Sequence, residues 1–449
     1  MQYIPNIIFL VVLAAGIGYF TKNIRKVIRN IKLGHAVDTS DHKKERWGNV
    51  IRIALGQSKM VVRPVSGLLH IIVYVGFIII NIEVIEIIID GLFGTHRVLA
   101  FLGPVYDFLI GSFELLALLV FIGVIVFWVR RNITRIKRFW SAEMKGWPKN
   151  DANYILYFEM ILMVLFITMN ALDLTLQQGV ASGAYTSEAA SHYISAGSYP
   201  VSQFLAPVFQ GMTEGTLILL ERGAWWLHII GILIFLNYLY FSKHLHIMLA
   251  FPNVFYGKVT PKGKFKNLDS VTNEVKLMMD PTADPYAAPA EGAEAPAKFG
   301  ASDVLDLNRI QLLNAYTCTE CGRCTSECPA NQTGKKLSPR KIMMDTRDRL
   351  QEVSKNIDTN GEFKEDGKQL LDNYITREEL WACTTCNACV EACPVSIDPL
   401  SIIMDMRQYL VMEQSAAPNE LNVTMSNIEN NSAPWPFNQM DRLNWKDEG

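Results

Sequence analysis

The sequence predicts an all-α protein in which a bundle of five transmembrane helices is followed by a soluble helical domain. Three observations lead to this expectation. Apolar residues are crowded into long runs before residue 252, whereas the rest has ordinary soluble composition. All eight cysteines lie in two short motifs in the last third of the chain. Between these motifs, apolar residues recur at helical spacing.

Five apolar runs are long enough to be membrane helices, since a helix needs about 20 such residues to cross the hydrocarbon core. The first run could instead be a signal peptide, but its basic residues follow the apolar core rather than precede it. We therefore expect an uncleaved helix there. The predicted segments are 4–20, 65–89, 105–129, 154–174 and 224–250.

The basic residues between these segments predict the orientation. Eleven Lys and Arg lie in residues 22–63 and seven in residues 130–149. The connections on the other side contain only Arg97 and Arg222. Because basic loops stay on the cytoplasmic side, we expect the N-terminus outside and the C-terminal half in the cytoplasm. The predicted location is the bacterial inner (cytoplasmic) membrane, which the chain crosses several times.

Composition divides the chain into four parts. Residues 257–303 are rich in Pro and Ala and poor in bulky apolar residues, which is typical of a flexible linker. The tail has one aromatic island at Trp435 and Phe437, and it either docks on a partner or is loosely ordered. The parts are a membrane domain (1–252), a linker (253–303), a soluble domain (304–412) and a tail (413–449).

The cysteines form two copies of the pattern C-x2-C-x2-C-x3-C-P, which end at Pro329 and Pro394. This bacterial pattern binds [4Fe–4S] clusters, and its fourth cysteine ligates the other cluster of the pair. Structural zinc also uses C-x2-C pairs, but two complete copies of this spacing favour iron–sulfur clusters. The predicted ligands are Cys318, Cys321, Cys324 and Cys393 for cluster one, and Cys383, Cys386, Cys389 and Cys328 for cluster two.

The two motifs are separated by 54 residues with amphipathic helical patterns. Residues 310–412 resemble the helical ferredoxin that forms the C subunit of heterodisulfide reductase, and they are similar to the C-terminal half of succinate dehydrogenase iron–sulfur subunits. The stretch LWACTTCNACVEACPV carries most of this resemblance. It implies a cytoplasmic, helical two-cluster ferredoxin domain.

Four histidines lie in or beside membrane segments, where ionisable residues are functional by default and neutral imidazole is a usual axial ligand of haem iron. His228 and His246 are 18 residues apart. On one continuous helix that is five turns, so both would share a face about 27 Å apart along the axis. His244 would point the other way. The depth of His70 matches that of His246, so we expect one haem b between them, with solvated interfacial histidines as the alternative.

The helix layout of residues 1–250 resembles the gamma subunit of membrane nitrate reductases, and GLLHIIVYVGF resembles its second helix around the first ligand. That family has two b haems, which implies a second, outer haem at His228. The sequence departs from the family pattern here, because Ile80 occupies the position expected for the other outer ligand. His96 is the substitute that we predict, followed by His192.

Three acidic residues, Glu83, Glu86 and Asp90, follow one stripe of the second segment toward its outer end. Buried carboxyls in a membrane can carry protons, here to or from a quinone. An acidic edge that faces neighbouring helices or headgroups is the equally open alternative.

The sequence has no dinucleotide fingerprint, P-loop, nucleophile elbow or CCG cysteine motif, and its net charge of −2 argues against a nucleic-acid partner. All cysteines are assigned to clusters, so no catalytic residues are predicted. We expect an electron-transfer subunit of a quinone-linked oxidoreductase that contacts lipid and quinone. The resemblances imply a cytoplasmic CCG-domain iron–sulfur protein or electron-transfer flavoprotein as partner. A haem-free membrane anchor that docks the ferredoxin domain, and a redox sensor, are the alternatives.

Overall fold

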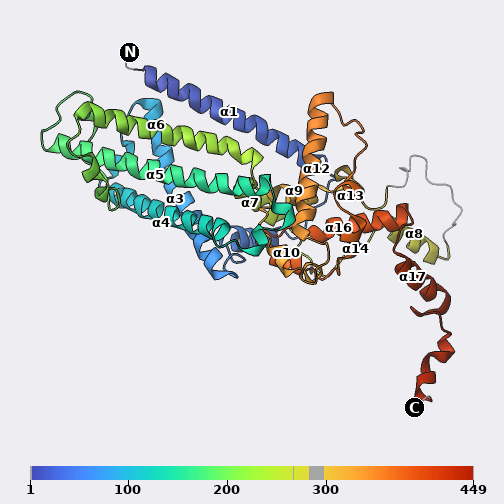
Figure 1. Cartoon of the computed structure of the whole chain (residues 1–449). Coiled ribbons are helices and arrows are strands. Elements are labelled where there is room, and N and C mark those ends of the chain that lie inside the picture. The colour runs from blue at the N-terminus through green and yellow to red at the C-terminus, as the bar shows by residue number, and fades with distance from the viewer. Residues whose placement is uncertain (1–2, 266, 283–297, 448–449) are drawn as a thin grey trace.

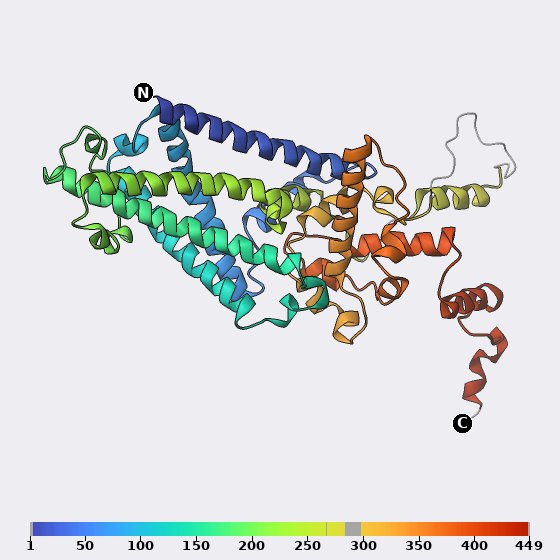
Figure 2. The same cartoon turned by 45° about the horizontal axis from the view of Figure 1, so that its top comes forward.

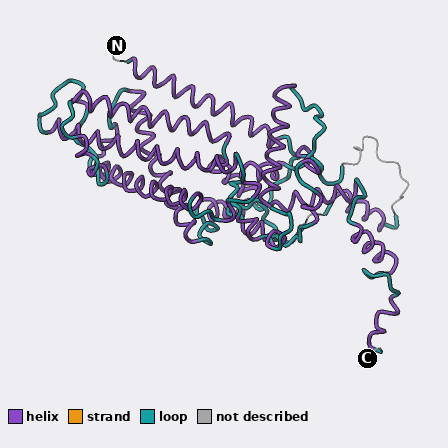
Figure 3. Tube along the Cα trace, in the orientation of Figure 1, coloured by secondary structure: helices purple, strands orange, loops and turns teal. Residues whose placement is uncertain are grey.

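The computed structural model describes residues 3–265, 267–282 and 298–447. It is about 70% helical, and no strand occurs in these three ranges. Figure 3 shows the helices and the loops that join them. The predicted all-α class is therefore confirmed. The most Pro- and Ala-rich part of the predicted linker, residues 283–297, lies outside the described residues.

Among the described residues, five helices are long and apolar enough to cross a membrane. Four of them begin with proline in the first turn, where its missing N–H costs no hydrogen bond. Only 11% of the most apolar window of the first helix is buried, because this helix lies at the rim of the bundle (Figure 2). The five helices are α1 (Ile4–Lys32), α3 (Pro64–Phe93), α4 (Pro104–Asn132), α5 (Trp147–Ala181) and α6 (Glu214–Tyr238).

The fifth predicted segment, 224–250, is not one helix. α6 ends at Tyr238, two short 3-10 turns follow, and a separate helix, α7 (His246–Tyr256), begins after them. His228 and His246 therefore lie on different helices. The prediction that they share one face of one continuous helix is wrong.

The break after α6 has a local cause. Ser242 is extended, with φ −111° and ψ 148°, and its hydroxyl accepts a hydrogen bond from the backbone N–H of His244. Asp151 on α5 accepts from the hydroxyl of Tyr238 at 2.6 Å and from the backbone N–H of Lys243 at 3.1 Å. A buried carboxylate thus binds donors on both sides of the break, which a continuous helix would not offer it.

Short helices form the remainder of the described chain. α2 (Lys43–Asn49) and a π-helix (Val50–Leu55) connect α1 to α3 near the bundle. In the chain, α8 (Asp269–Met279) follows α7. The cysteine motifs and their surroundings form the soluble domain, and α17 (Asn419–Asn431) lies in the tail. The soluble domain contains α9 (Arg309–Thr317), α10 (Arg323–Glu327), α11 (Pro329–Gln332), α12 (Pro339–Asn360), α13 (Leu370–Asn373), α14 (Arg377–Trp381), α15 (Ala388–Ala392) and α16 (Pro399–Gln408).

The soluble domain packs directly on one end of the bundle (Figure 1). Val27 of α1, Ile155 of α5 and Phe235 of α6 belong to the same buried cluster as Leu312 of α9 and Ile342 of α12. Apolar burial of this kind is the main favourable term in packing. One continuous core therefore holds the cysteine domain against the membrane domain.

The first helix is longer than predicted and contributes to this junction. It continues beyond residue 20 to Lys32. Lys26 and Arg29 form ion pairs with Asp358 at 2.8 and 2.5 Å, and the Asn30 amide donates to the Tyr316 hydroxyl at 2.8 Å. The last turns of α1 thus bind the soluble domain.

Gly34, just after α1, lies where the two domains touch most closely. The neighbouring His35 exchanges backbone hydrogen bonds of 3.0 Å with Leu307 and Arg309. A Cβ at position 34 would lie 2.8 Å from the backbone nitrogen of Arg309. Because backbone cannot yield as a side chain can, we expect Gly34→Ala to lower the free energy of unfolding by about 1–3 kcal/mol. Thermal unfolding of the detergent-solubilised chain measures the change.

Gly48 provides the matched control, because a Cβ there meets no atom within 4 Å. It lies in the helix α2, so Gly48→Ala should leave stability unchanged or raise it by up to about 1 kcal/mol. Equal unfolding of the two variants would contradict the role given to Gly34.

Candidate functional site

The two cysteine motifs adopt the same local structure. In each, the third cysteine lies in a short helix, α10 or α15, and the fourth ends that helix in an extended conformation. The residue before each helix has a left-handed backbone, with φ 71° at Gly322 and 61° at Asn387. Glycine and asparagine tolerate this conformation best. α10 and α15 pack against each other, so the two motifs face one another.

A cavity in the first motif is lined by Cys318, Cys321 and Cys324, and also by Cys389 and Cys393 of the second. Its lining thus contains all four cysteines predicted for cluster one, and one of them comes from the other motif. The fold therefore brings together residues that are far apart in the sequence.

The second motif shows the reciprocal arrangement. Cys383 interacts electrostatically with Cys328 and Cys386, and Cys389 does so with Cys383 and Cys328. Cys328 of the first motif therefore lies among the cysteines of the second. These are the four residues predicted for cluster two.

Zinc is the alternative metal for these cysteines. A tetrahedral zinc has Zn–S distances of about 2.3 Å, so its ligand sulfurs crowd together. Among the described residues, no three His, Cys, Asp or Glu side chains converge closely enough for a single metal ion.

Burial keeps these thiols neutral in the absence of metal. It raises the pKa of Cys318 and Cys389 to about 12 and that of Cys393 to about 11. Since the thiolate is the metal ligand, binding of iron must release these protons.

Loops of the membrane domain cover the cavity of the first motif. The guanidinium of Arg323 donates to the backbone carbonyl of Lys59 at 2.9 Å. The ammonium of Lys59 in turn donates to the carbonyl of Cys393 at 3.3 Å. Arg340 donates to the carbonyl of Arg138 at 2.6 Å. These hydrogen bonds tie Arg323, Arg340 and Cys393, which line the cavity, to loops of the membrane domain.

Glu320, inside the first motif, adds a buried ion-pair network. Its carboxylate pairs with Lys243 from the turn after α6 and with Arg347 of α12 at 2.8 Å. Burial opposes ionisation, but these two cations lower the pKa of Glu320 below its usual value. The first motif therefore faces the membrane domain, and its orientation is fixed by charge as well as by packing.

The loop of the second motif is open to solvent. Of the eight cysteines, only Cys386 is exposed. The guanidinium of Arg407 holds the loop by donating to the carbonyls of Leu380 and Cys383, both at 2.6 Å. The second motif thus offers its metal-binding loop to a molecule approaching from solvent.

Three of the predicted histidines lie together at the end of the bundle next to the first motif. The rings of His244 and His246 have centroids 5.3 Å apart. Burial, followed by the charges of His246 and His70, lowers the pKa of His244 well below its usual value. The charge of Arg323, which lines the cysteine cavity, also acts on His70. The predicted pair of His70 and His246 is thus brought together, although His246 lies on α7 and not on a continuation of α6.

The ring nitrogens of this pair suit axial ligation. Nδ1 of His246 contacts the backbone carbonyl of Lys243 at 3.1 Å, and a proton on Nδ1 leaves Nε2 with a free lone pair. Nδ1 of His70 is buried and has no hydrogen-bond partner among the described residues.

The predicted outer ligands are not brought together. His228 is buried beside Phe166, with ring centroids 5.9 Å apart. His96 lies against Tyr193, and its Nε2 contacts Asp173 at 3.1 Å. His192 is exposed. Because Asp173 occupies the metal-binding nitrogen of His96, the residues at this end do not fit a second haem.

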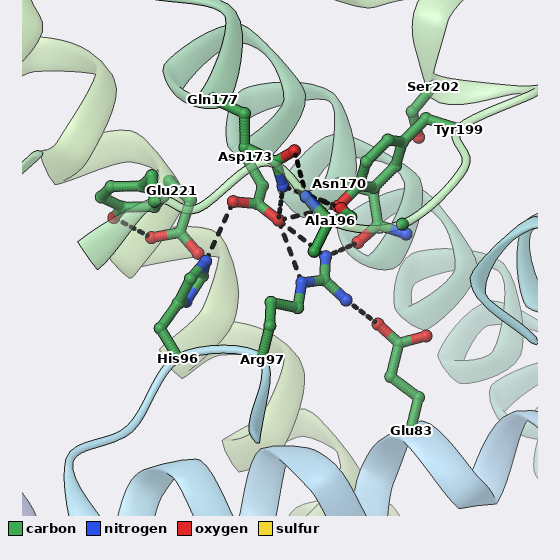
Figure 4. Close-up of polar contacts among 12 residues, drawn as sticks. Glu83, His96, Arg97, Asn170, Asp173, Gln177, Ala196, Tyr199, Ser202 and Glu221 are labelled. Carbon is green, nitrogen blue, oxygen red and sulfur yellow. Dashed lines mark hydrogen bonds and ion pairs between the residues drawn. The ribbon is translucent and has the colours of Figure 1, made fainter. Parts of the chain in front are cut away.

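Sequence reasoning missed the residue at the centre of this outer end. Arg97 is 6% exposed and binds Asp173 through two guanidinium nitrogens at 3.0 and 2.8 Å. It also donates to Glu83 at 3.0 Å and to Asn170 at 2.8 Å (Figure 4). The sequence does contain a signal for this network. Arg97 is the only Lys or Arg between two membrane segments that contain several carboxyl groups.

Comparison with known proteins identifies the soluble domain. Residues 317–397 match the family of 4Fe-4S dicluster domains, which confirms that the cysteine motifs are iron–sulfur motifs. Over 28% of its length, the chain is 30% identical to the C subunit of a ferredoxin/F(420)H(2)-dependent CoB-CoM heterodisulfide reductase of Methanosarcina acetivorans, of which it covers 65%. The predicted resemblance to heterodisulfide reductase is also confirmed.

Two relatives are similar over nearly the whole chain. One is the probable iron-sulfur-binding oxidoreductase FadF of Bacillus subtilis (strain 168), 30% identical over 98% of this chain. The other is an EtfAB:quinone oxidoreductase of Syntrophomonas wolfei subsp. wolfei, 25% identical over 92% of this chain. The chain spans 61% and 55% of the lengths of these two proteins. No solved structure matches it.

Proposed function

We propose that this iron–sulfur protein is a membrane electron-transfer subunit that relays electrons between a cytoplasmic redox partner and membrane quinone. The observation that carries the proposal is the position of the first cysteine motif. It is tied to the bundle through Glu320 and Arg323 and lies beside the histidine pair. A soluble electron carrier held at the end of a membrane bundle is suited to exchange electrons with a lipid-soluble molecule.

In this proposal each cluster has ligands from both motifs. Cys393 completes the first site and Cys328 the second. The exposed Cys386 makes the second cluster the one that meets the soluble partner, and the first cluster faces the membrane. Two [4Fe–4S] clusters supply one-electron carriers, and the protein's own part is to hold them in this order.

One haem b completes the proposal, with His70 and His246 as axial ligands. The interaction of His70 with His246, and the backbone contact of His246 that leaves its Nε2 free, support this assignment. When bound, a haem supplies a further one-electron carrier inside the membrane domain. We do not propose the outer haem at His228 and His96.

The basic loops that cover the first motif support the proposed orientation, with the iron–sulfur domain in the cytoplasm and the chain in a bacterial inner membrane. The Syntrophomonas relative is named as an EtfAB:quinone oxidoreductase. We therefore propose an electron-transfer flavoprotein as the cytoplasmic partner, with a CCG-domain iron–sulfur protein as the alternative.

The experiment is a reduced-minus-oxidised absorption spectrum of the purified full-length chain, together with reduction of a short-chain quinone by the reduced protein. We expect b-type haem bands that are lost in His70→Ala and His246→Ala, since each variant removes one axial ligand. His228→Ala is the matched control, a buried histidine of the same bundle that should keep the bands.

A second candidate function is a haem-free anchor that docks the ferredoxin domain on a larger complex. The continuous core between the bundle and the soluble domain favours it. Well-folded protein that contains both clusters but shows no haem bands would establish this alternative, and so would a failure of the reduced protein to reduce quinone.

A further inference from the structure

Five buried carboxyl groups surround Arg97 at the end of the bundle opposite the cysteine domain, and none is more than 9% exposed. Four of them accept hydrogen bonds on both oxygens, from backbone N–H groups or side chains. Both oxygens of these four groups are therefore paired within the network. They are Glu86, Asp90, Glu114 and Asp173.

Glu83 is the exception. Its Oε1 accepts from Arg97 at 3.0 Å, but its Oε2 has no hydrogen-bond partner among the described residues, although the side chain is only 2% exposed. Figure 4 shows this second oxygen pointing away from Arg97. An unpaired, buried carboxylate oxygen costs more than one that carries a proton. The chemistry available to Oε2 is therefore to bind a proton or to donate one.

The charged groups near Glu83 also favour a proton on its carboxyl group. Arg97 is a single cation and divides its hydrogen bonds between Glu83 and Asp173. The carboxyls of Glu86 and Glu114 also act on Glu83 from α3 and α4. Carboxyls outnumber the cation that they share, and like charges in a low-dielectric site do not all ionise together. Glu83 has the fewest donors and is the group that takes up the proton.

Exposed apolar side chains lie close to this network in the chain. The residues that follow Arg97 form a short 3-10 turn (Val98–Leu102) in which no side chain is buried. Phe101 in this turn is 77% exposed, and Ile82 and Ile85, which flank Glu83 on α3, are 40% and 57% exposed. Apolar side chains suited to contact lipid thus flank the buried network on α3 and in the turn after Arg97.

We propose that Glu83 is the proton-donating residue for a membrane quinone at this end of the bundle, an inference that rests on the proposed function. Reduction of a quinone to quinol takes up two electrons and two protons. The electrons come from the soluble redox partner through the clusters and the haem of the proposed function. For each of the two protons, the O–H bond at Glu83 Oε2 breaks as one forms on a quinone oxygen, and Glu83 then regains a proton from water at the adjacent membrane surface.

The test uses the full-length protein and compares Glu83→Gln with Glu86→Gln. The first measurement is infrared spectroscopy in H₂O and D₂O, which detects the C=O stretch of a protonated carboxyl. We expect the Glu83 band in the wild type and in E86Q, because Glu83 is intact in both, and its loss from the spectrum of E83Q. The second is the rate at which the reduced protein reduces a short-chain benzoquinone or naphthoquinone.

E83Q should slow quinone reduction at least about 100-fold, the usual contribution of a positioned general acid. Its haem and cluster spectra should not change, because Glu83 lies 13 residues, or about 20 Å along the axis, from His70. Wild-type rates in E83Q, or a carboxyl band that survives in it, would overturn the proposal for Glu83 alone. If the wild type itself reduces no quinone, the proposed function fails first.

Discussion

The double variant Cys318→Ala, Cys393→Ala is expected to retain about four irons per chain, whereas Cys383→Ala, Cys393→Ala should retain almost none. The reason is the shared cavity, which Cys318 and Cys393 line although they belong to different motifs. Removing both damages one cluster, but removing Cys383 and Cys393 damages two. The wild type should contain about eight irons, and iron analysis with electron paramagnetic resonance of the reduced protein measures the difference.

The reciprocal variant Cys328→Ala, Cys383→Ala provides the matched control. Both residues belong to the proposed second cluster, so this variant should also retain about four irons. If each motif instead held its own cluster, the results would be reversed, with Cys383→Ala, Cys393→Ala keeping half of the iron. Alanine is used because a serine oxygen could replace a lost thiolate.

The second large effect is expected at Arg97. Arg97→Met keeps an unbranched side chain but removes the cation that binds Glu83 and Asp173. Removing one partner of a buried ion pair leaves an uncompensated charge, which costs about 3–5 kcal/mol. We therefore expect a markedly lower midpoint of thermal unfolding for the membrane domain in detergent, followed by circular dichroism.

Arg135→Met is the control, since Arg135 is exposed and its only contact among those described is with the ring of Trp140 at 5.0 Å. Its loss should cost no more than about 1 kcal/mol. Adding Asp173→Asn to Arg97→Met removes the stranded charge, so the double variant should be less unstable than the sum of the single changes. Additive losses would show that Arg97 acts by packing alone.

The membrane helices and the cysteine motifs could be predicted from the sequence because both are local patterns. A run of apolar residues determines a membrane helix whatever it packs against. The spacing of Cys318, Cys321 and Cys324 likewise determines a metal-binding loop within a few residues. The exchange of Cys328 and Cys393 is also a prediction from a spacing rule, and of these two residues Cys393 lines the cavity of the first motif.

The relative positions of the histidines were harder to predict, because they depend on where α6 ends. Treating residues 224–250 as one helix placed His228 and His246 on one face. The break after Tyr238 depends on Asp151, a residue from another helix that binds both sides of it. Nothing within the segment itself signals this contact.

The sequence by itself therefore determined a five-helix membrane protein with an iron–sulfur domain, since both follow from residues close together in the chain. Only the tertiary structure decided which groups meet: the cysteine domain on the end of the bundle, His96 on Asp173, and Arg97 among carboxyls from three helices. These contacts join residues that are distant in sequence, and their energies depend on burial and on the number of hydrogen-bond donors. The single unpaired oxygen of Glu83 is visible only when every donor around Arg97 has been placed.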